Sequence, residues 1–466
     1  FFIEKVAREN KILLLGVGGS KRSELYHLIK FLKTKELAKK IVLMPGIQTF
    51  PTPLKAHNLE EITELQNIYK EDGLQVGCSD HVDGDKEEAL ILPLMAMAKG
   101  VSLIEKHFTI DRKQKWEDFE SALDKNNFAK LVKWVHDFAP LLESPVNFNN
   151  EEIKYRNNFK KTPSTNRDLK KGETVKEEDI IFVKEEYIKV PLPSQDIAGK
   201  IIQTDLKKGQ HFRGNLFKNK VGAIIVARNS SQRFPEKALK KIQGKETIAL
   251  LIERIKRCKN VDSVILATST DPSDNILGKI AEKENVGFYQ GDLNNVAKRF
   301  CDTARTYQFD HIVRITGDDI LRDEEMIDIA IESHLYNSSD VTFTTNMPYG
   351  TASEVFSFKT LETILNRVKI PSNTEYLEWI LENERNFNVN YVSSKYQFPE
   401  ELRLTLDYEE DFKLFSRVFD HFYPKSPNFS LRDVLKLICE NKHLMKINEM
   451  MLPKFKKHQL DLGLNI

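Results

Sequence analysis

Hydrophobic residues recur in short runs separated by amphipathic stretches through the first part of the chain. Apolar runs at 11–15, 41–44, 74–78 and 101–105 predict strands, and the stretches between them predict helices. Strands that alternate with helices are typical of parallel βα units. Four such units make half of a (β/α)8 barrel, which typically needs ~250 residues. We therefore predict a partial barrel over residues 1–150.

The pattern changes in residues 151–217. Two similar segments, Asp168-Leu-Lys-Lys-Gly and Asp205-Leu-Lys-Lys-Gly, each precede a short extended run. A lysine pair followed by glycine is typical of a turn in this position. The segment therefore predicts a small, turn-rich β unit.

Strands and helices alternate again in residues 218–466, which we predict to be a third, α/β domain. Its first strand is expected at Val221–Ala227, an apolar run rich in β-branched residues of the kind found in buried strands. Further strands are expected at 263–267, 286–289, 311–316 and 402–406.

The composition narrows the possible functions. Lys+Arg 70 and Asp+Glu 69 leave a net charge of +1, which gives no general attraction to nucleic acid or to an anionic membrane. The longest apolar run, 89–98, is far shorter than the ~20 residues of a membrane helix. The four cysteines are scattered, which is typical of reduced thiols. We expect a cytoplasmic protein that binds neither nucleic acid nor membrane.

Three cations follow the strand at 221–227, namely Arg228, Arg233 and Lys237, among small and turn-forming residues. Guanidinium groups bind phosphate oxygens in pairs, and a loop after a buried strand adds backbone N–H donors. The spacing Ala-Arg-x-x-Ser-x-Arg-x-Pro-x-Lys therefore predicts a phosphate-binding loop.

Carboxylates follow two later predicted strands. Asp318 and Asp319 come after 311–316, and Asp407 comes after 402–406. Ligands of parallel sheets bind beyond the carboxyl ends of the strands. Because Mg²⁺ takes one or two carboxylates together with phosphates and water, we predict that Asp318 and Asp407 hold it.

The loop and the acidic segments, in this order, resemble the sugar cytidylyltransferases, with the spore-coat polysaccharide branch as the nearest. The resemblance implies a Rossmann-like nucleotide-diphospho-sugar transferase fold and transfer of CMP from CTP to an acidic sugar. Arg228, Lys237 and Asp318 would then be catalytic. Further substrate contacts are expected from Arg233, Ser231, Asn295, Arg299 and Glu354, with Arg314 and Arg403 as candidate anchors for the sugar carboxylate or the phosphates.

Two histidines stand at matching strand ends in the first part, His81 in Gly-Cys-Ser-Asp-His and His107 in Glu-Lys-His-Phe-Thr. Two such histidines could ligate one divalent metal. With Asp118 they resemble the N-acetylneuraminate synthase family, which condenses phosphoenolpyruvate with an N-acylated hexosamine. The resemblance implies Mn²⁺ or a similar metal on His81 and His107, Ser79 near phosphoenolpyruvate, and Asp118 on the substrate.

The chain also departs from that family. Its first four or so βα units have no counterpart here, so we expect no condensation by this chain alone, and we favour a fragment of a longer protein over a vestigial synthase. Residues 151–217 resemble the SAF (antifreeze-like) domain that follows the synthase barrel, with Lys184 nearest the position of an arginine that contacts the sugar. A homodimer is expected.

Two other functions remain open at this point. A GT-A-type glycosyltransferase has a similar sheet and an acidic metal motif, but its diphosphate-sugar donor does not require three cations in one loop. A non-catalytic assembly subunit of a surface-polysaccharide pathway would retain its function without Asp318.

Overall fold

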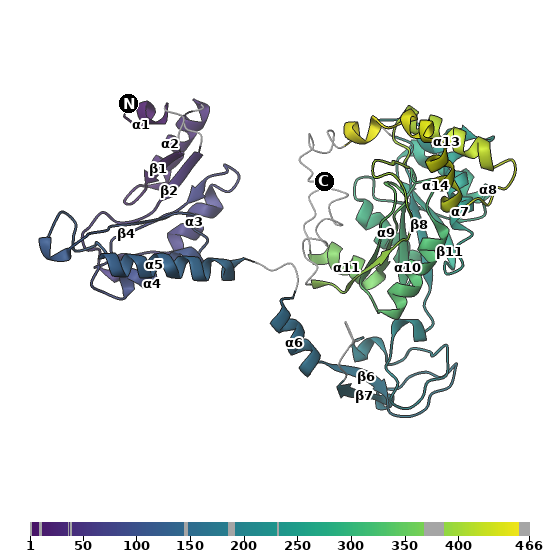
Figure 1. The fold of residues 1–466 in the computed structure, drawn as a ribbon, viewed down its shortest axis with the longest axis horizontal. Helices are drawn as coiled ribbons and strands as arrows, with labels where there is room; N and C mark the ends of the chain where they lie inside the picture. Colours follow the sequence, from purple (N-terminus) through teal and green to yellow (C-terminus); the bar gives the residue numbers. More distant parts are fainter. Residues whose placement is uncertain are drawn as a thin grey trace. The chain divides into compact units, whose positions relative to one another are not determined.

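The chain forms two compact units, Phe1–Ser144 and Pro145–Ile466 (Figure 1). The computed structural model describes residues 2–8, 12–35, 37, 40–143, 148–184, 192–230, 233–367 and 386–455. In the described residues, no helix is both long enough and apolar enough to span a bilayer.

The first unit is built from parallel strands with intervening helices. Its strands are β1 (Ile12–Gly16), β2 (Lys40–Met44), β3 (Gln75–Val76), β4 (Cys78–Asp80) and β5 (Ile104–Lys106). Its helices are α1 (Phe2–Ala7), α2 (Arg22–Thr34), α3 (Glu60–Ile68), α4 (Glu88–Ala98) and α5 (Lys125–Phe138). Strands β1, β2 and β3 pair in parallel, as do β4 and β5. The predicted parallel βα units are therefore present.

The strand predicted at 74–78 is divided into β3 and β4 at Gly77. A Cβ atom on Gly77 would lie 2.4 Å from the sulfur of Met44 and 2.8 Å from the carbonyl oxygen of Leu103. Only glycine fits this close approach. Before Gly77 the chain pairs with β2 through β3, and after Gly77 it pairs with β5 through β4. The result places Ser79 and His81 at the end of β4.

The second unit begins with α6 (Asn150–Phe159) and a small antiparallel pair, β6 (Lys161–Thr165) and β7 (Ile180–Lys184). The two Asp-Leu-Lys-Lys-Gly segments of this region pair with each other. Asp168 accepts hydrogen bonds from the side chain of Lys207 and the amide of Lys208, each at 2.9 Å. Asp205 accepts the equivalent bonds from the first lysine pair, at 2.8 and 3.0 Å. The two repeated segments therefore bind each other through equivalent hydrogen bonds.

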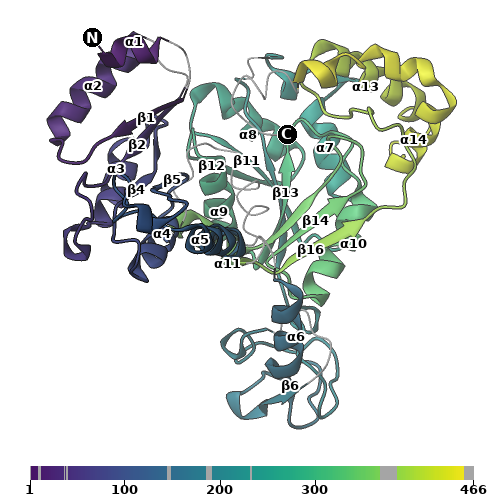
Figure 2. The same ribbon diagram turned by 60° about the vertical axis from the view of Figure 1, so that its left-hand side comes forward.

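A seven-stranded sheet lies at the centre of the rest of the second unit, in the order β12-β11-β8-β13-β15-β14-β16. Figure 2 labels five of these strands, β11, β12, β13, β14 and β16. Only β15 runs antiparallel to its neighbours among these strands. The strands are β8 (Val221–Val226), β11 (Ser263–Ser269), β12 (Gly287–Gly291), β13 (His311–Thr316), β14 (Val341–Thr345), β15 (Glu354–Ser357) and β16 (Val389–Ser393).

Helices cover both faces of this sheet. The helices are α7 (Thr247–Ile255), α8 (Asn275–Lys283), α9 (Val296–Tyr307), α10 (Glu324–Tyr336), α11 (Phe358–Arg367), α13 (Glu409–Phe422) and α14 (Leu431–Glu440). A short hairpin, β9 (Lys241–Ile242) and β10 (Lys245–Glu246), precedes α7. Ala223 and Ile225 of β8 pack in one core with α7 and α10, while Ile224 packs on the other face with α9. Burial on both faces explains the continuous apolar run of β8.

The strand predicted at 402–406 is not a strand of this sheet. Its one bridge joins Arg403 to Tyr349, a loop residue, and the Leu406 amide donates to the Asp318 carbonyl oxygen at 2.9 Å. The segment is buried and apolar at alternate positions, which accounts for the prediction. Because its partners are loops, it runs as an extended segment that delivers Asp407 beside Asp318.

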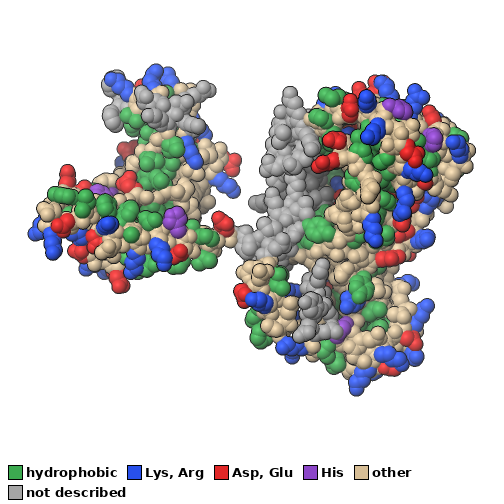
Figure 3. All heavy atoms as spheres, in the orientation of Figure 1, with side chains coloured by type: hydrophobic (Ala, Val, Ile, Leu, Met, Phe, Trp, Pro, Cys, Tyr) green, Lys and Arg blue, Asp and Glu red, His purple; other side chains and the backbone are tan. Residues whose placement is uncertain are grey.

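Charged side chains of both signs are interspersed over the drawn face of each unit in Figure 3. This distribution agrees with the near-zero net charge of the sequence.

Candidate nucleotide-binding site

Lys237 lies between two carboxylates that come from distant parts of the chain. Its Nζ donates to Asp318 Oδ2 at 2.7 Å and to Asp407 Oδ1 at 3.0 Å. Asp318 follows the carboxyl end of β13, and Lys237 ends the loop that follows β8. These strands are parallel neighbours, so their carboxyl ends meet at one edge of the sheet. Three residues predicted from separate motifs therefore converge.

Two arginines complete the charge around Asp407. Arg233 donates to Oδ1 at 2.8 Å and is about one-third exposed, whereas Arg403 donates to Oδ2 at 2.6 Å and is buried. The Arg403 guanidinium also lies 3.4 Å from Asp411 and packs over the rings of three aromatic residues, Tyr349, Tyr408 and Phe455. Arg403 is thus enclosed, whereas about one-third of the Arg233 side chain stays exposed.

Arg228, the first cation of the loop, is exposed. The base of its loop is fixed by Asp274, a residue that the sequence motifs did not single out. Asp274 is fully buried and accepts from the Asn229 amide at 2.6 Å, the Thr268 hydroxyl at 2.8 Å and the Ser269 hydroxyl at 2.5 Å. The carboxylate therefore joins the loop after β8 to the end of β11.

The segment before α9 holds two more of the predicted residues. Asn295 caps α9 by accepting from the Lys298 amide at 2.8 Å. Arg299 is buried and donates to the carbonyl oxygens of Asp292, at 2.8 Å, and of Leu293, at 3.3 Å. Both residues shape the turn at 292–295 in this state.

Arg314 and Glu354 lie opposite each other on β13 and β15 and form an ion pair at 3.2 Å. Both side chains are mostly buried. Ser231, the remaining predicted residue of the phosphate loop, lies outside the described residues.

The predicted synthase residues of the first unit also gather at strand ends. The His81 and His107 rings lie 5.1 Å apart between centroids, and Phe50 contacts both. His81 Nδ1 lies 2.7 Å from the Ile47 carbonyl oxygen, an arrangement that leaves Nε2 as the acceptor nitrogen. Asp118 Oδ2 lies 3.8 Å from His107 Nδ1.

Ser79 is the fourth predicted residue of this cluster. Its hydroxyl donates to Glu105 on the neighbouring strand at 2.7 Å. On the same two strands, Lys106 and Asp80 form a buried ion pair at 2.7 Å that sequence reasoning did not identify. Both pairs join β4 to β5, so they fix the two strand ends that carry the histidines.

Comparison with known proteins finds a matching family for each of two parts of the chain. The family model described as cytidylyltransferase matches residues 222–418, and that of the NeuB family matches residues 1–146. The uncharacterized protein MJ1063 of Methanocaldococcus jannaschii is 34% identical over 231 residues, which are 49% of this chain and 94% of that protein. This chain joins a NeuB-family segment to a cytidylyltransferase. The predicted resemblances to the cytidylyltransferases and to the synthase family are therefore confirmed, and the resemblance of residues 151–217 to the SAF domain stays a prediction.

Two further relatives correspond to the two parts. The spore coat polysaccharide biosynthesis protein SpsF of Bacillus subtilis is 27% identical over 232 residues, covering 48% of this chain and 95% of SpsF. The pseudaminic acid synthase of Campylobacter jejuni is 28% identical over 208 residues, covering 45% of this chain. The chain spans 58% of that synthase.

The electrostatics of the cytidylyltransferase site follow from its buried charges. Burial alone would lower the pKa of Lys237, but the carboxylates of Asp318 and Asp407 outweigh it and raise this pKa. Burial would raise the pKa of Asp318, yet the Lys237 ammonium lowers it to about 2. Lysine and aspartate therefore remain an ion pair at neutral pH.

Asp319, next to Asp318, has a different environment. Its Oδ2 accepts from Arg322 at 2.6 Å and from the Thr316 hydroxyl at 2.5 Å. Burial raises the pKa of Asp319 to about 6, with Arg322 opposing and Asp318 adding to the rise. Asp319 is therefore enclosed with its own arginine, and Asp318 is the carboxylate that faces Lys237.

Both families generally use a divalent metal. In the described residues, no three His, Cys, Asp or Glu side chains converge as a ready metal cluster. Asp318 and Asp407 nevertheless aim two oxygens at one cation, the Lys237 ammonium. Two converging carboxylates fit a divalent cation that takes oxygen ligands, with phosphates and water to supply the others.

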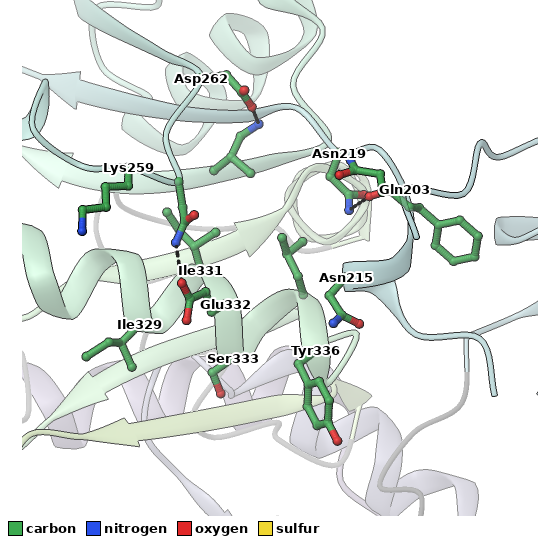
Figure 4. A pocket seen from close by; sticks show the side chains of 14 residues that line it. Gln203, Asn215, Asn219, Lys259, Asp262, Ile329, Ile331, Glu332, Ser333 and Tyr336 are labelled. Atoms are coloured by element: carbon green, nitrogen blue, oxygen red, sulfur yellow. Dashed lines mark hydrogen bonds between the residues drawn. The ribbon is translucent and has the colours of Figure 1, made fainter. Parts of the chain in front are cut away.

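A pocket of about 840 Å³ lies at the opposite, amino edge of the cytidylyltransferase sheet (Figure 4). Gln203, Asn215 and Asn219 line it from the segment before β8, and Glu332 and Tyr336 line it from α10. Asn260 donates to Glu332 at 3.0 Å within it. None of the predicted site residues lines this pocket, so it is separate from the edge that carries Lys237 and Asp318.

Proposed function

We propose that the cytidylyltransferase activates an acidic sugar of the nonulosonic (sialic-acid-like) class, consuming CTP and releasing pyrophosphate. The observation that carries the proposal is the Lys237 ammonium between Asp318 and Asp407, at 2.7 and 3.0 Å, beside the loop that carries Arg228 and Arg233. Cations for phosphate oxygens and carboxylates for a metal lie at one edge of a parallel sheet, where such folds bind ligands. The name of the pseudaminic acid synthase, a relative of the NeuB-family segment, supports the acidic-sugar class.

The reaction is a displacement at the α-phosphorus of CTP. The anomeric hydroxyl oxygen of the sugar forms the new O–P bond, its proton passes to solvent, and the bond from the α-phosphorus to pyrophosphate breaks. Asp318 and Asp407 would hold Mg²⁺, which supplies charge neutralisation to the phosphates. Arg228, Arg233 and Lys237 bind phosphate oxygens and stabilise the departing pyrophosphate. Catalysis is positioning and electrostatic stabilisation.

The other predicted residues support this site. Asn295 and Arg299 shape the turn before α9 on the base and sugar side, with Ser231 as a further contact in the phosphate loop. Arg314 is a candidate anchor for the sugar carboxylate or the phosphates, and Glu354 on the sugar side is its ion-pair partner in the free protein. Arg403 acts through Asp407, whose Oδ2 it binds at 2.6 Å.

For the NeuB-family segment we propose a part of a phosphoenolpyruvate-condensing synthase. His81 and His107 would bind Mn²⁺ or a similar ion, with Asp118 on the sugar substrate and Ser79 near phosphoenolpyruvate. Residues 151–217 would form the SAF domain, and the protein would act as a cytoplasmic homodimer. The support is the juxtaposition of the two imidazoles with Asp118.

The test is pyrophosphate release from CTP with Mg²⁺ and a panel of nonulosonic acids. Wild type is compared with Asp318→Ala and with a matched control, Asp420→Ala, an exposed residue of α13. We expect release that requires one of the sugars, is retained by the control and is lost in Asp318→Ala. Transfer of a sugar to an acceptor without pyrophosphate release would contradict the proposal in favour of a glycosyltransferase.

A further inference from the structure

Lys237 occupies the position that a metal ion would take between Asp318 and Asp407. Its Nζ lies within 3.0 Å of an oxygen of each carboxylate, and its side chain is 15% exposed. Two carboxylates on one cation are the set that Mg²⁺ would use here. The ammonium and a metal ion therefore compete for the same two oxygens.

We propose that Lys237 is the resident cation of the nucleotide-free protein, and that the metal enters only as its complex with a nucleoside triphosphate. The inference rests on the proposed function and adds an order of binding to it. On entry of the metal–triphosphate complex, the Lys237 ammonium moves from the carboxylates to the phosphate oxygens.

The charges around Asp407 disfavour a metal ion that arrives alone. Arg233 shares Oδ1 with Lys237 at 2.8 Å, and Arg403 holds Oδ2 at 2.6 Å. A free divalent ion would have to displace the ammonium and then lie beside two guanidinium groups. The positive charges of the ion and the guanidinium groups would repel each other strongly, because little solvent is present to screen them. A metal–triphosphate complex carries net negative charge, so it gives the displaced ammonium and Arg233 new anionic partners.

The backbone at Lys237 is fixed, so the ammonium changes partners from carboxylates to phosphates by movement of the side chain alone. Lys237 begins a short 3-10 helix that ends at Leu239, after Glu236 in a left-handed conformation at φ +54°. The Thr247 hydroxyl donates to the Lys237 carbonyl oxygen at 2.6 Å. A lysine has a flexible four-carbon stem, which lets its ammonium change partners while the loop stays in place.

The experiment measures binding of Mn²⁺ alone and of CTP with Mn²⁺ to the full chain, by calorimetry and by the electron paramagnetic resonance signal of free Mn²⁺. We compare wild type with Lys237→Met and with Lys240→Met, an exposed lysine of the same loop. For Lys237→Met we expect affinity for Mn²⁺ alone to rise on the order of tenfold or more, because a competing cation is removed. Its affinity for the Mn²⁺–CTP complex should fall, and Lys240→Met should behave as wild type.

A double variant, Lys237→Met with Asp318→Asn, should lose the gain in Mn²⁺ affinity if that gain comes from the freed carboxylates. Wild type that binds Mn²⁺ alone as tightly as Lys237→Met would overturn the inference, even when CTP binds and pyrophosphate is released. Folded wild-type protein that binds no CTP with or without Mn²⁺ would instead contradict the proposed function. The two failures are therefore distinguishable.

Discussion

Asp274 accepts a hydrogen bond of 2.6 Å from the amide of Asn229, the residue that follows Arg228 in the phosphate loop. The same carboxylate binds the hydroxyls of Thr268 and Ser269 at the end of β11. Two neighbouring strand ends are thereby held in one arrangement by a residue that is fully buried.

We expect Asp274→Ala to raise the KM for CTP by about tenfold to a hundredfold with a smaller change in kcat, because Arg228 loses its fixed position. Steady-state kinetics of pyrophosphate release measures both parameters, and circular dichroism checks the fold. Asp271→Ala is the matched control, since Asp271 is an unburied acid that caps the same turn through Ser273. Equal KM values in Asp274→Ala and wild type would contradict a positioning role.

Arg403→Met should lower the free energy of unfolding by about 3–5 kcal/mol, because it removes the buried cation beside Asp411 and one of the three cations that contact Asp407. Urea unfolding of the variant and wild type measures the difference. Arg305→Met is the control, because Arg305 is 53% exposed and its ion pairs should contribute less than about 1 kcal/mol. Similar losses in both variants would show that Arg403 is not specially required.

Two histidines that are not among the predicted site residues, His311 and His334, predict acid sensitivity. His311 Nδ1 lies 3.0 Å from His334 Nε2, and His334 Nδ1 lies 3.0 Å from the Thr342 hydroxyl. Burial, with the Lys200 charge, lowers the pKa of His311 from 6.5 to about 3, and burial and His311 lower that of His334 well below 6.5. Both imidazoles therefore stay neutral in the folded protein over a range in which the unfolded chain binds protons.

Stability should therefore fall as the pH decreases from about 6.5 towards about 3, by up to about 1.4 kcal/mol per pH unit for each histidine. The measurement is chemical unfolding at pH steps through this window. We expect His334→Gln to reduce the slope, whatever its effect on stability at neutral pH. An unchanged slope in a variant that folds would mean that other groups bind the protons.

The repeat in residues 151–217 predicts a small core that depends on two equivalent leucines. Leu169 and Leu206 bridge each other's backbones, and both side chains are buried. Leu169→Ala should destabilise this region by about 2–5 kcal/mol. Hydrogen exchange of the amides in this region measures the change. Leu141→Ala, at a position with 74% exposure, should have little effect on stability.

The sequence indicated the convergence of Arg233, Lys237 and Asp318, because they follow apolar runs that form neighbouring parallel strands, whose carboxyl ends meet at one edge of the sheet. It also indicated Asp407, although 402–406 brings Asp407 to this edge as an extended segment and not as a strand of the sheet. It indicated His81 with His107 for the same reason as Lys237 with Asp318. It did not indicate Asp274, whose partners lie on two different strand ends, or the pairing of Arg314 with Glu354, which depends on the register of β13 and β15.

The sequence by itself determined the βα units of both parts, the buried central strand β8 and the order of the charged motifs, since local periodicity and turn residues specify these. Only the tertiary structure decided that 402–406 packs against loops instead of joining the sheet, that Arg403 is enclosed while Arg233 stays partly exposed, and that Lys237 bridges two carboxylates. The physical reason is that burial and hydrogen-bond partners arise from segments far apart in the chain, and a one-dimensional pattern does not specify which of them meet.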